Sequence, residues 1–247
     1  MKPLTHFVKM LFIIAVSGQF GKHVHVKHQY TWHDAQQHCR DVHTDLSPIT
    51  SPQDEERLKI ATKGKADGMS WIGLYFNARK WKWSGGGDAT NIPWAAHQPN
   101  DLASQKFAFV CWNVCKWKGW HNHMSSFKLQ FFCFNLIVPQ FKKTWEQAML
   151  YCRHKHNELT SLTSETEHLL ALSEIKHSNI TERVWIGLCF LGDRWLWVNG
   201  DTLEYKAWPI SGDQDHECPM QKRCGALSKE GVWENWECWD ELNFICY

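Results

Sequence analysis

The sequence predicts an α+β fold that is built twice in one chain, and three observations lead to this prediction. Residue motifs recur along the chain at a nearly constant shift. Each copy begins with two helical segments and continues as short apolar pieces broken by Gly, Asn, Asp and Pro, a pattern typical of strands and loops. The length of 247 residues suits two domains of about 110 residues better than one. Two helices followed by a loop-rich antiparallel sheet form an α+β domain.

The internal repeat is the strongest of these observations. A Thr-Trp-x-x-Ala segment, with a Cys-Arg pair shortly after it, begins at Thr31 and again at Thr144, a shift of 113 residues. A Trp-Ile-Gly-Leu segment begins at Trp71 and again at Trp185, a shift of 114. Because the shift changes by one residue over the whole length, the chain contains a tandem duplication.

Domain boundaries follow from the repeat. We expect a first domain over residues 23–134 and a second domain over residues 135–247. Ten residues separate Cys133 from Thr144, the expected cap of the next helix, and they must also contain the first strand of the second domain. Since no flexible linker remains, we expect the two domains to behave as one semi-rigid body.

The first residues are typical of a signal peptide, which we assign to residues 1–18. Lys2 and Lys9 supply a positive n-region, and seven apolar residues from Met10 to Val16 form a short h-region before a small-residue cleavage point. This run is far below the roughly 20 residues needed to span a bilayer. The alternative is a short membrane anchor. No later stretch could span a membrane, so we expect a secreted, extracellular protein.

Capping residues mark the helix starts. Thr31 and Thr144 are expected to cap the first helix of each copy, with Gln147 completing a capping box in the second copy. The second helices are expected to begin at Ser51, where Pro52 suits the first helical position, and at Ser164, where Glu167 three residues on indicates a capping box. In the first helix of the second copy, four residues with helical spacing form the predicted buried face: Trp145, Ala148, Met149 and Cys152.

Composition and charge exclude several classes of function. The 27 basic and 26 acidic residues nearly cancel, so no basic stripe points to nucleic acid. The chain has 15 His, but no His-Glu-x-x-His motif occurs and the cysteines fall at repeat positions, so we do not expect an enzyme. Ten cysteines are expected to pair in an oxidising compartment, where the sequon at Asn179 predicts glycosylation. The His-rich stretch from His23 to His28 is expected to form an exposed strand or leader.

Surplus tryptophans leave two interpretations open. The chain has 16 Trp. Four of them could equally be anchors of an interface or part of the core: Trp112, Trp117, Trp236 and Trp239.

The repeated motifs resemble the signature of the C-type lectin fold. The resemblance rests on the first-helix cysteine, the Trp-Ile-Gly-Leu strand, a Trp-x-Trp pair and the closing Leu-x-Phe-x-Cys at Cys133 and Cys246. It covers about residues 23–247 and is similar to tandem-domain lectins of the mannose-receptor-like and selectin-like kind. It implies an extracellular recognition protein that binds a glycan or glycoprotein, in innate immunity or cell adhesion. The alternative is a calcium-independent module on the same fold that binds a protein ligand.

The resemblance also implies two disulfides in each domain. Three of them map cleanly: Cys39–Cys133, Cys152–Cys246 and Cys224–Cys238. We expect an extra bridge between Cys189 and Cys218. The nested bridge of the first copy does not map, because the position that matches Cys238 is Ser125. Cys111 and Cys115 therefore either pair locally across a tight turn or leave one cysteine free.

The family's sugar site is a calcium ion held by oxygen ligands from one loop and one strand. In the first copy Gln98-Pro99-Asn100 matches the loop motif, whose proline bond is cis in the family, and Asp101 could add charge. After Trp120, His121-Asn122 replaces the family's Asn-Asp, so the strand carboxylate is missing. The candidate carbohydrate- and calcium-binding residues are Gln98, Asn100, Asp101 and Asn122. We expect weak calcium binding at best; the alternative is that the loop is only a turn.

The second copy has lost more of this motif. Its loop contains no x-Pro-Asn or x-Pro-Asp triplet, and Glu234-Asn235 keeps one acid and one amide in swapped order. The acids Asp213, Asp215 and Glu217 are typical of a solvated loop. We therefore expect no family-type sugar or calcium site in the second domain.

Overall fold

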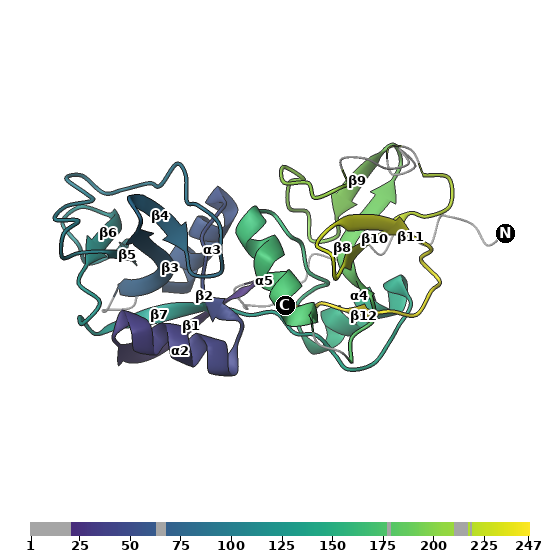
Figure 1. Cartoon of the computed structure of the whole chain (residues 1–247), viewed down its shortest axis with the longest axis horizontal. Coiled ribbons are helices and arrows are strands. Elements are labelled where there is room, and N and C mark those ends of the chain that lie inside the picture. The colour runs from purple at the N-terminus through teal and green to yellow at the C-terminus, as the bar shows by residue number, and fades with distance from the viewer. Residues whose placement is uncertain (1–20, 63–67, 177–178, 210–216, 218) are drawn as a thin grey trace.

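The computed structural model describes residues 21–62, 68–176, 179–209, 217 and 219–247, and the predicted signal peptide lies outside them. Figure 1 shows two α+β units side by side along the long axis of the molecule. The predicted fold class is confirmed: each unit has two helices and its own sheet. Among the described helices, none has the length and apolar character needed to cross a bilayer.

The first domain is built on a seven-stranded sheet in the order β1-β7-β3-β5-β6, with β2 paired to β7 and β4 paired to β3. β3 and β7 run parallel, and the other pairs are antiparallel. The elements are β1 (His23–Tyr30), α2 (Trp32–Val42), β2 (Asp45–Leu46), α3 (Pro52–Thr62), β3 (Met69–Asn77), β4 (Lys80–Trp83), β5 (Phe107–Cys111), β6 (Gly119–His123) and β7 (Leu129–Phe134).

The second domain repeats this plan with a five-stranded sheet in the order β11-β10-β8-β12, with β9 paired to β8. The elements are α4 (Trp145–Lys155), α5 (Glu165–Ile175), β8 (Arg183–Leu191), β9 (Arg194–Trp197), β10 (Cys224–Ser228), β11 (Trp233–Trp236) and β12 (Asn243–Phe244). The strand expected between Cys133 and Thr144 is reduced to two isolated bridges, Ile137 to Cys246 and Lys143 to Leu242. Pro139 lies between them and has no N–H to continue a ladder.

The helices begin where the capping residues predict. The Thr31 hydroxyl accepts a hydrogen bond from the Asp34 N–H, and the Thr144 hydroxyl accepts one from the Gln147 N–H. The predicted face of α4 is buried throughout. One detail differs in α5, where the Glu167 carboxylate accepts from the N–H of residue 163, one position before the cap. The same carboxylate oxygen also accepts a hydrogen bond from the Lys22 ammonium at 2.7 Å.

The disulfides hold the first helix of each domain to its closing strand. Four bridges form in the described part of the chain: Cys39–Cys133, Cys111–Cys115, Cys152–Cys246 and Cys224–Cys238. Cys111 and Cys115, whose state the sequence left open, thus pair locally. Cys189, expected to pair with Cys218, is instead a buried free thiol, because its side chain packs in the core beside Trp145 and Cys152. Cys218 lies outside the described residues.

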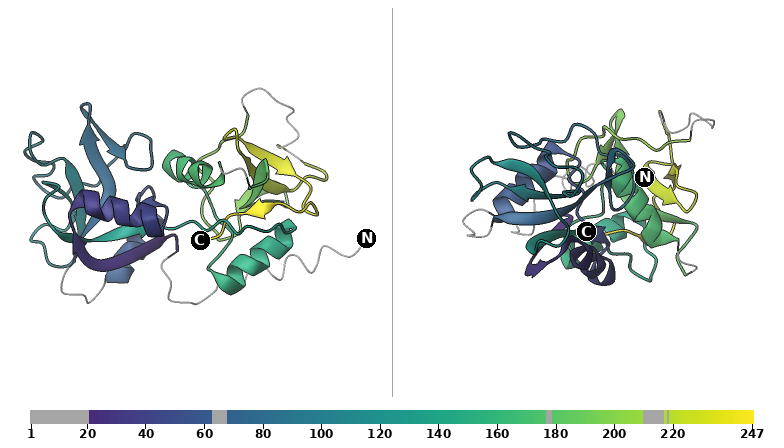
Figure 2. Two further views of the ribbon diagram at one scale, coloured as in Figure 1. Left: turned by 60° about the horizontal axis from the view of Figure 1, so that its bottom comes forward. Right: turned by 60° about the vertical axis from the view of Figure 1, so that its left-hand side comes forward.

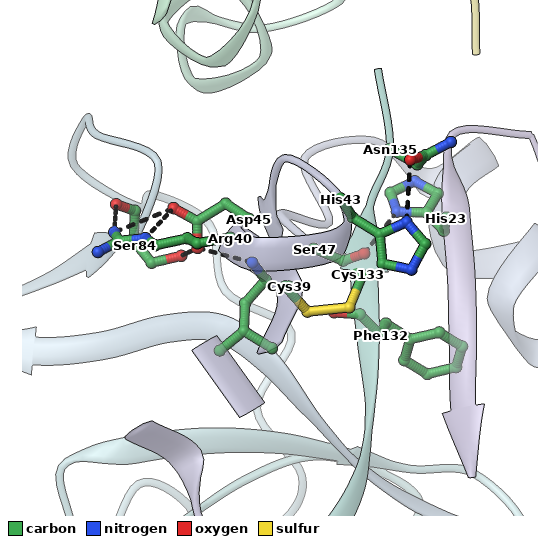
Figure 3. The surroundings of a disulfide bond; sticks show 11 residues. His23, Cys39, Arg40, His43, Asp45, Ser47, Ser84, Phe132, Cys133 and Asn135 are labelled. Carbon is green, nitrogen blue, oxygen red and sulfur yellow. Dashed lines mark hydrogen bonds and ion pairs between the residues drawn. A yellow bond between two sulfur atoms is a disulfide. The ribbon is translucent and has the colours of Figure 1, made fainter. Parts of the chain in front are cut away.

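The start of the first domain is packed against the Cys39–Cys133 bridge (Figure 3). The His-rich segment does form a strand, and its second half, which includes His28, is exposed as expected. His23 at its start is instead buried, and its Nδ1 lies 3.0 Å from the Ser47 hydroxyl. Close by, the His43 Nδ1 lies 2.9 Å from the Asn135 Oδ1. This contact fastens the first residues of the second domain to the first domain.

Buried charges cross the junction between the domains. The Lys22 ammonium lies 2.7 Å from the Glu167 carboxylate, and the two side chains are 1% and 0% exposed. Burial alone would lower the pKa of Lys22, but Glu167, Asp54 and Asp201 outweigh it and raise this pKa. Burial would likewise raise the pKa of Asp54, but contacts with His23 and Lys22 outweigh it and lower this pKa. The junction therefore contains mutually dependent charges from both domains.

The two sides of the junction use equivalent elements, since α3 and α5 each contact a loop of the other domain. Arg57 on α3 donates to Asp201 in the loop after β9, at 2.8 Å. On the other side, α5 packs against Gly85–Gly87 in the loop after β4, with Leu170 at Gly85, Leu169 at Gly86 and Thr166 at Gly87. Arg57 matches Leu170 at the repeat shift of 113, and Asp201 matches Gly87 at the shift of 114. The domains thus meet through a pseudo-twofold interface, in which each contributes the same surface.

The glycine run after β4 permits the close approach on one side. A Cβ on Gly85 would lie 2.6 Å from Leu170 side-chain atoms, so any larger residue would push α5 away. Gly86 has φ +106°, and its carbonyl accepts a hydrogen bond from the Thr166 hydroxyl at 2.9 Å. Together with the buried charges, this packing gives a physical basis for the expected semi-rigid body.

Candidate functional site

The predicted site residues lie at the end of the first domain remote from the second domain. β5 and β6 occupy that end in each view (Figure 1, Figure 2). The loop that follows Trp94 joins β6 through the Ala95 N–H, which donates to the Trp120 carbonyl at 2.9 Å. This contact brings the loop motif and the strand motif to the same place.

Asn122 on β6 is hydrogen-bonded to the other two predicted amide residues, Gln98 and Asn100. Its Oδ1 accepts from the Asn100 N–H at 2.9 Å, and its Nδ2 donates to the carbonyls of Asn100 and Gln105 at 2.5 and 2.7 Å. Its own N–H donates to the Gln98 Oε1 at 3.3 Å. The Gln98–Pro99 peptide bond is cis, as the resemblance implies. Asn122 is buried, Gln98 is half-buried and Asn100 is exposed.

Asp101 does not join these amides. Its carboxylate accepts a hydrogen bond from the Ser104 hydroxyl, and its carbonyl accepts from the N–H groups of Ser104 and Gln105. Asp101 therefore stabilises the turn that follows the loop motif. Among the four candidates, the structure brings together Gln98, Asn100 and Asn122.

The donor set of this site does not fit a calcium ion. Calcium takes six to eight oxygens, carboxylates above all. Here the Gln98 Oε1 and the Asn122 Oδ1 already accept backbone N–H groups, and the nearest carboxylate, that of Asp101, is engaged in its own turn. Within the described ranges, no three or more His, Cys, Asp or Glu side chains come together in a way that could hold a metal ion.

An exposed tryptophan adjoins the amides, and sequence reasoning did not connect it with them. The ring of Trp117 is 43% exposed and lies 5.3 Å from the ring of His97, the residue before Gln98. The Lys116 ammonium lies 4.7 Å from the Trp117 ring centroid. The only hint in the sequence was the surplus Cys115, because its disulfide with Cys111 shapes the loop that carries Lys116 and Trp117.

The other tryptophans divide between the two interpretations left open. Trp112 is buried and belongs to the core of the first domain. Trp236 is half-buried, with the Arg183 guanidinium 4.1 Å from its ring centroid. Trp239 is 78% exposed. Trp112 is therefore a core residue, whereas Trp117 and Trp239 remain available to a ligand.

In the second domain, the one acid left at the strand motif, Glu234, forms an internal ion pair. The Glu234 carboxylate accepts from the Arg183 Nε at 2.6 Å, so an internal cation neutralises it. Asp213 and Asp215 lie outside the described residues, and Glu217 is exposed. The described residues of this domain do not reproduce the amide arrangement of the first domain.

Comparison with known proteins identifies the family. Residues 28–134 and residues 141–247 each match the Lectin C-type domain, so the chain belongs to the C-type lectin family and contains two tandem domains of it. The resemblance inferred from the motifs is thereby confirmed. Each half of the chain is therefore a C-type lectin-like domain.

Relatives match either one domain or both. The chain is 31% identical over 110 residues to Dromaiocalcin-1 of Dromaius novaehollandiae, which covers 41% of this chain and 74% of that protein. It is 20% identical over 271 residues to C-type mannose receptor 2 of Homo sapiens, which covers 89% of this chain but spans only 18% of the receptor. Human lithostathine, a solved structure, is 28% identical with a TM-score of 0.40, covering 45% of this chain and 88% of that one.

Proposed function

We propose that this chain is an extracellular recognition protein whose first domain binds carbohydrate with weak or no dependence on calcium. One observation carries the proposal: Gln98, Asn100 and Asn122 come together at the remote end of the first domain. The carboxamides of Gln98 and Asn100 each carry donors and acceptors, which suit the hydroxyl groups of a sugar. Buried Asn122 fixes the loop, and the exposed Asn100 side chain faces the ligand.

Calcium contributes little to this recognition. The family cage neutralises a divalent ion with several carboxylates, whereas these amides leave the ion's charge uncompensated. We therefore expect weak calcium binding in the first domain at best. In the second domain, where Arg183 neutralises Glu234, we expect no binding of the family type.

Secretion and the absence of catalysis belong to the same proposal. Four disulfides in the described chain suit an oxidising compartment, to which a signal peptide at residues 1–18 would direct the chain. Asn179 is exposed, and we expect it to be glycosylated. Unchanged gel mobility of secreted material after glycosidase treatment would contradict the glycosylation. No reaction is expected, because recognition alone accounts for the amide cluster.

A calorimetric calcium titration followed by a glycan array, with and without chelator, tests the proposed function. We expect glycan binding that survives chelation and is lost in Asn100→Ala. The matched control is Asn235→Ala, at the position in the second domain that corresponds to Asn122. Tight calcium binding with chelator-sensitive glycan binding would refute the calcium-independent part. Glycan binding that Asn100→Ala leaves unchanged would refute the site.

A protein ligand is the second candidate function, and one observation favours it. Met220 and Trp239 on the second domain are 87% and 78% exposed, which is unusual for such large apolar side chains. An empty glycan array, combined with a cell-surface protein whose binding Trp239→Ala abolishes, would establish this alternative. Glycan binding lost in Asn100→Ala and retained in Trp239→Ala would exclude it as the main function.

A further inference from the structure

The loop between β5 and β6 is held in place by two short-range contacts. Cys111 at the end of β5 forms a disulfide with Cys115, four residues later. A ring nitrogen of His121 on β6 lies 2.8 Å from the Trp117 carbonyl oxygen, and the His121 ring stacks on Phe109 at 5.2 Å. These contacts position Trp117 and its neighbours as a fixed projection.

This projection adjoins the amide cluster directly. The Trp117 ring contacts the His97 ring edge-to-face at 5.3 Å, and His97 immediately precedes Gln98. Although His97 and Lys116 both contact it, 43% of Trp117 remains exposed. An exposed aromatic ring beside hydrogen-bonding amides is the usual composition of a small-ligand site.

The stretch of chain that forms this surface is rich in lysine. Lys106, Lys116 and Lys118 are exposed, and the chain from Leu102 to Trp145 contains no Asp or Glu. Asp101, just before this stretch, is an exposed acid whose carboxylate accepts a hydrogen bond from the Ser104 hydroxyl, so the lysines outnumber the acids here. Because the whole chain has a formal net charge of only +1, this concentration of lysines is local. A local cationic surface attracts anionic ligands.

We propose that a basic–aromatic surface binds an anionic sugar, one that carries sulfate or carboxylate, without calcium. The surface comprises His97, Lys116, Trp117 and Lys118 together with the carboxamides of Gln98 and Asn100. The sugar ring packs on Trp117, its hydroxyls bond to the carboxamides, and its anionic group meets the Lys116 ammonium. This proposal rests on the proposed function and names its ligand class: lysine supplies the positive charge that calcium supplies in the family cage.

Titration calorimetry of the full chain in EDTA tests the proposal with three probes: a heparin-derived hexasaccharide, sialyllactose and neutral lactose. We expect at least one anionic probe to bind more tightly than lactose, and increasing salt to weaken that binding. Trp117→Ala should weaken it by about tenfold or more, and Lys116→Gln by about fivefold at low salt. The matched controls, Trp239→Ala and Lys142→Gln, remove an exposed tryptophan and an exposed lysine elsewhere and should leave binding unchanged.

The conservative variant Trp117→Phe separates a lost stacking surface from a disturbed loop, since it should retain most of the affinity. Lactose binding as tight as that of both anionic probes would overturn the proposal while leaving carbohydrate recognition intact. Anionic binding that persists in both Trp117→Ala and Lys116→Gln would overturn it by placing the ligand elsewhere. Failure of both anionic probes to bind would overturn it as well.

Discussion

Replacing Lys22 by methionine should destabilise the junction between the domains. Methionine keeps most of the apolar stem but removes the ammonium that lies 2.7 Å from Glu167. Glu167 is 0% exposed, and Asp54 and Asp201 also surround Lys22, so the loss leaves excess negative charge in a buried place. Breaking a buried ion pair by removing one partner typically costs about 3–5 kcal/mol. We expect a loss in the free energy of unfolding within this range.

Urea unfolding followed by tryptophan fluorescence, with disulfides intact, measures this loss. The control Lys142→Met removes an exposed lysine and should change the free energy of unfolding by less than about 0.5 kcal/mol. Adding Glu167→Gln to Lys22→Met should recover part of the loss, because it removes the unpaired charge.

A Lys22→Met protein as stable as its Lys142→Met control would refute the reasoning, because Glu167 would then have access to water. A loss that Glu167→Gln fails to reduce would also count against it. In that case the stem of Lys22, and not its charge, would stabilise the interface.

Three further predictions concern other parts of the structure. Asp54 and Asp201 have lowered pKa values in the folded protein, so they stabilise it above the unfolded pKa of about 4 and lose this effect as pH falls. Urea unfolding between about pH 5 and pH 2 should therefore show a falling free energy of unfolding. A free energy that does not change over this range would contradict the prediction. Gly86→Ala should cost more stability than Gly192→Ala, because both have positive φ but only Gly86 faces a side chain within 3 Å; equal thermal shifts would disprove the close packing. Burial raises the pKa of Cys189 to about 12, so its thiol should resist iodoacetamide at about pH 8 until the protein unfolds, as peptide mass spectrometry can show; rapid labelling of the folded protein would exclude the buried thiol.

The sequence predicted the features that the repeat shares between its copies. Cys39 and Cys152 occupy the same place in the two copies, so their partners could be inferred together. The pairing of Cys111 with Cys115 could not, because the first copy departs from the second there and a local bridge has no counterpart to compare. The position of Trp117 beside the amides was unpredictable for the same reason.

The junction between the domains was also beyond sequence reasoning. Lys22 and Glu167 are 145 residues apart, and no periodic pattern links a residue before the first strand with a helix of the other domain. Glu167 read as part of a capping box, which accounts for its place near the helix start but not for its cation partner. A glycine run such as Gly85–Gly87 indicates a turn, but it does not reveal which helix approaches it.

Because of the pseudo-twofold interface, the chain resembles a dimer whose two subunits are joined in one polypeptide. In a true homodimer every substitution appears on both subunits, so both ends must recognise the same ligand. Duplication removes that constraint, and the interface itself already shows the divergence: Arg57 meets Asp201 on one side, and Leu170 meets the glycine run on the other. The two ends point away from each other (Figure 1) and differ in chemistry. Two unlike surfaces at opposite ends of one chain suit the joining of two different ligands better than the cross-linking of identical ones.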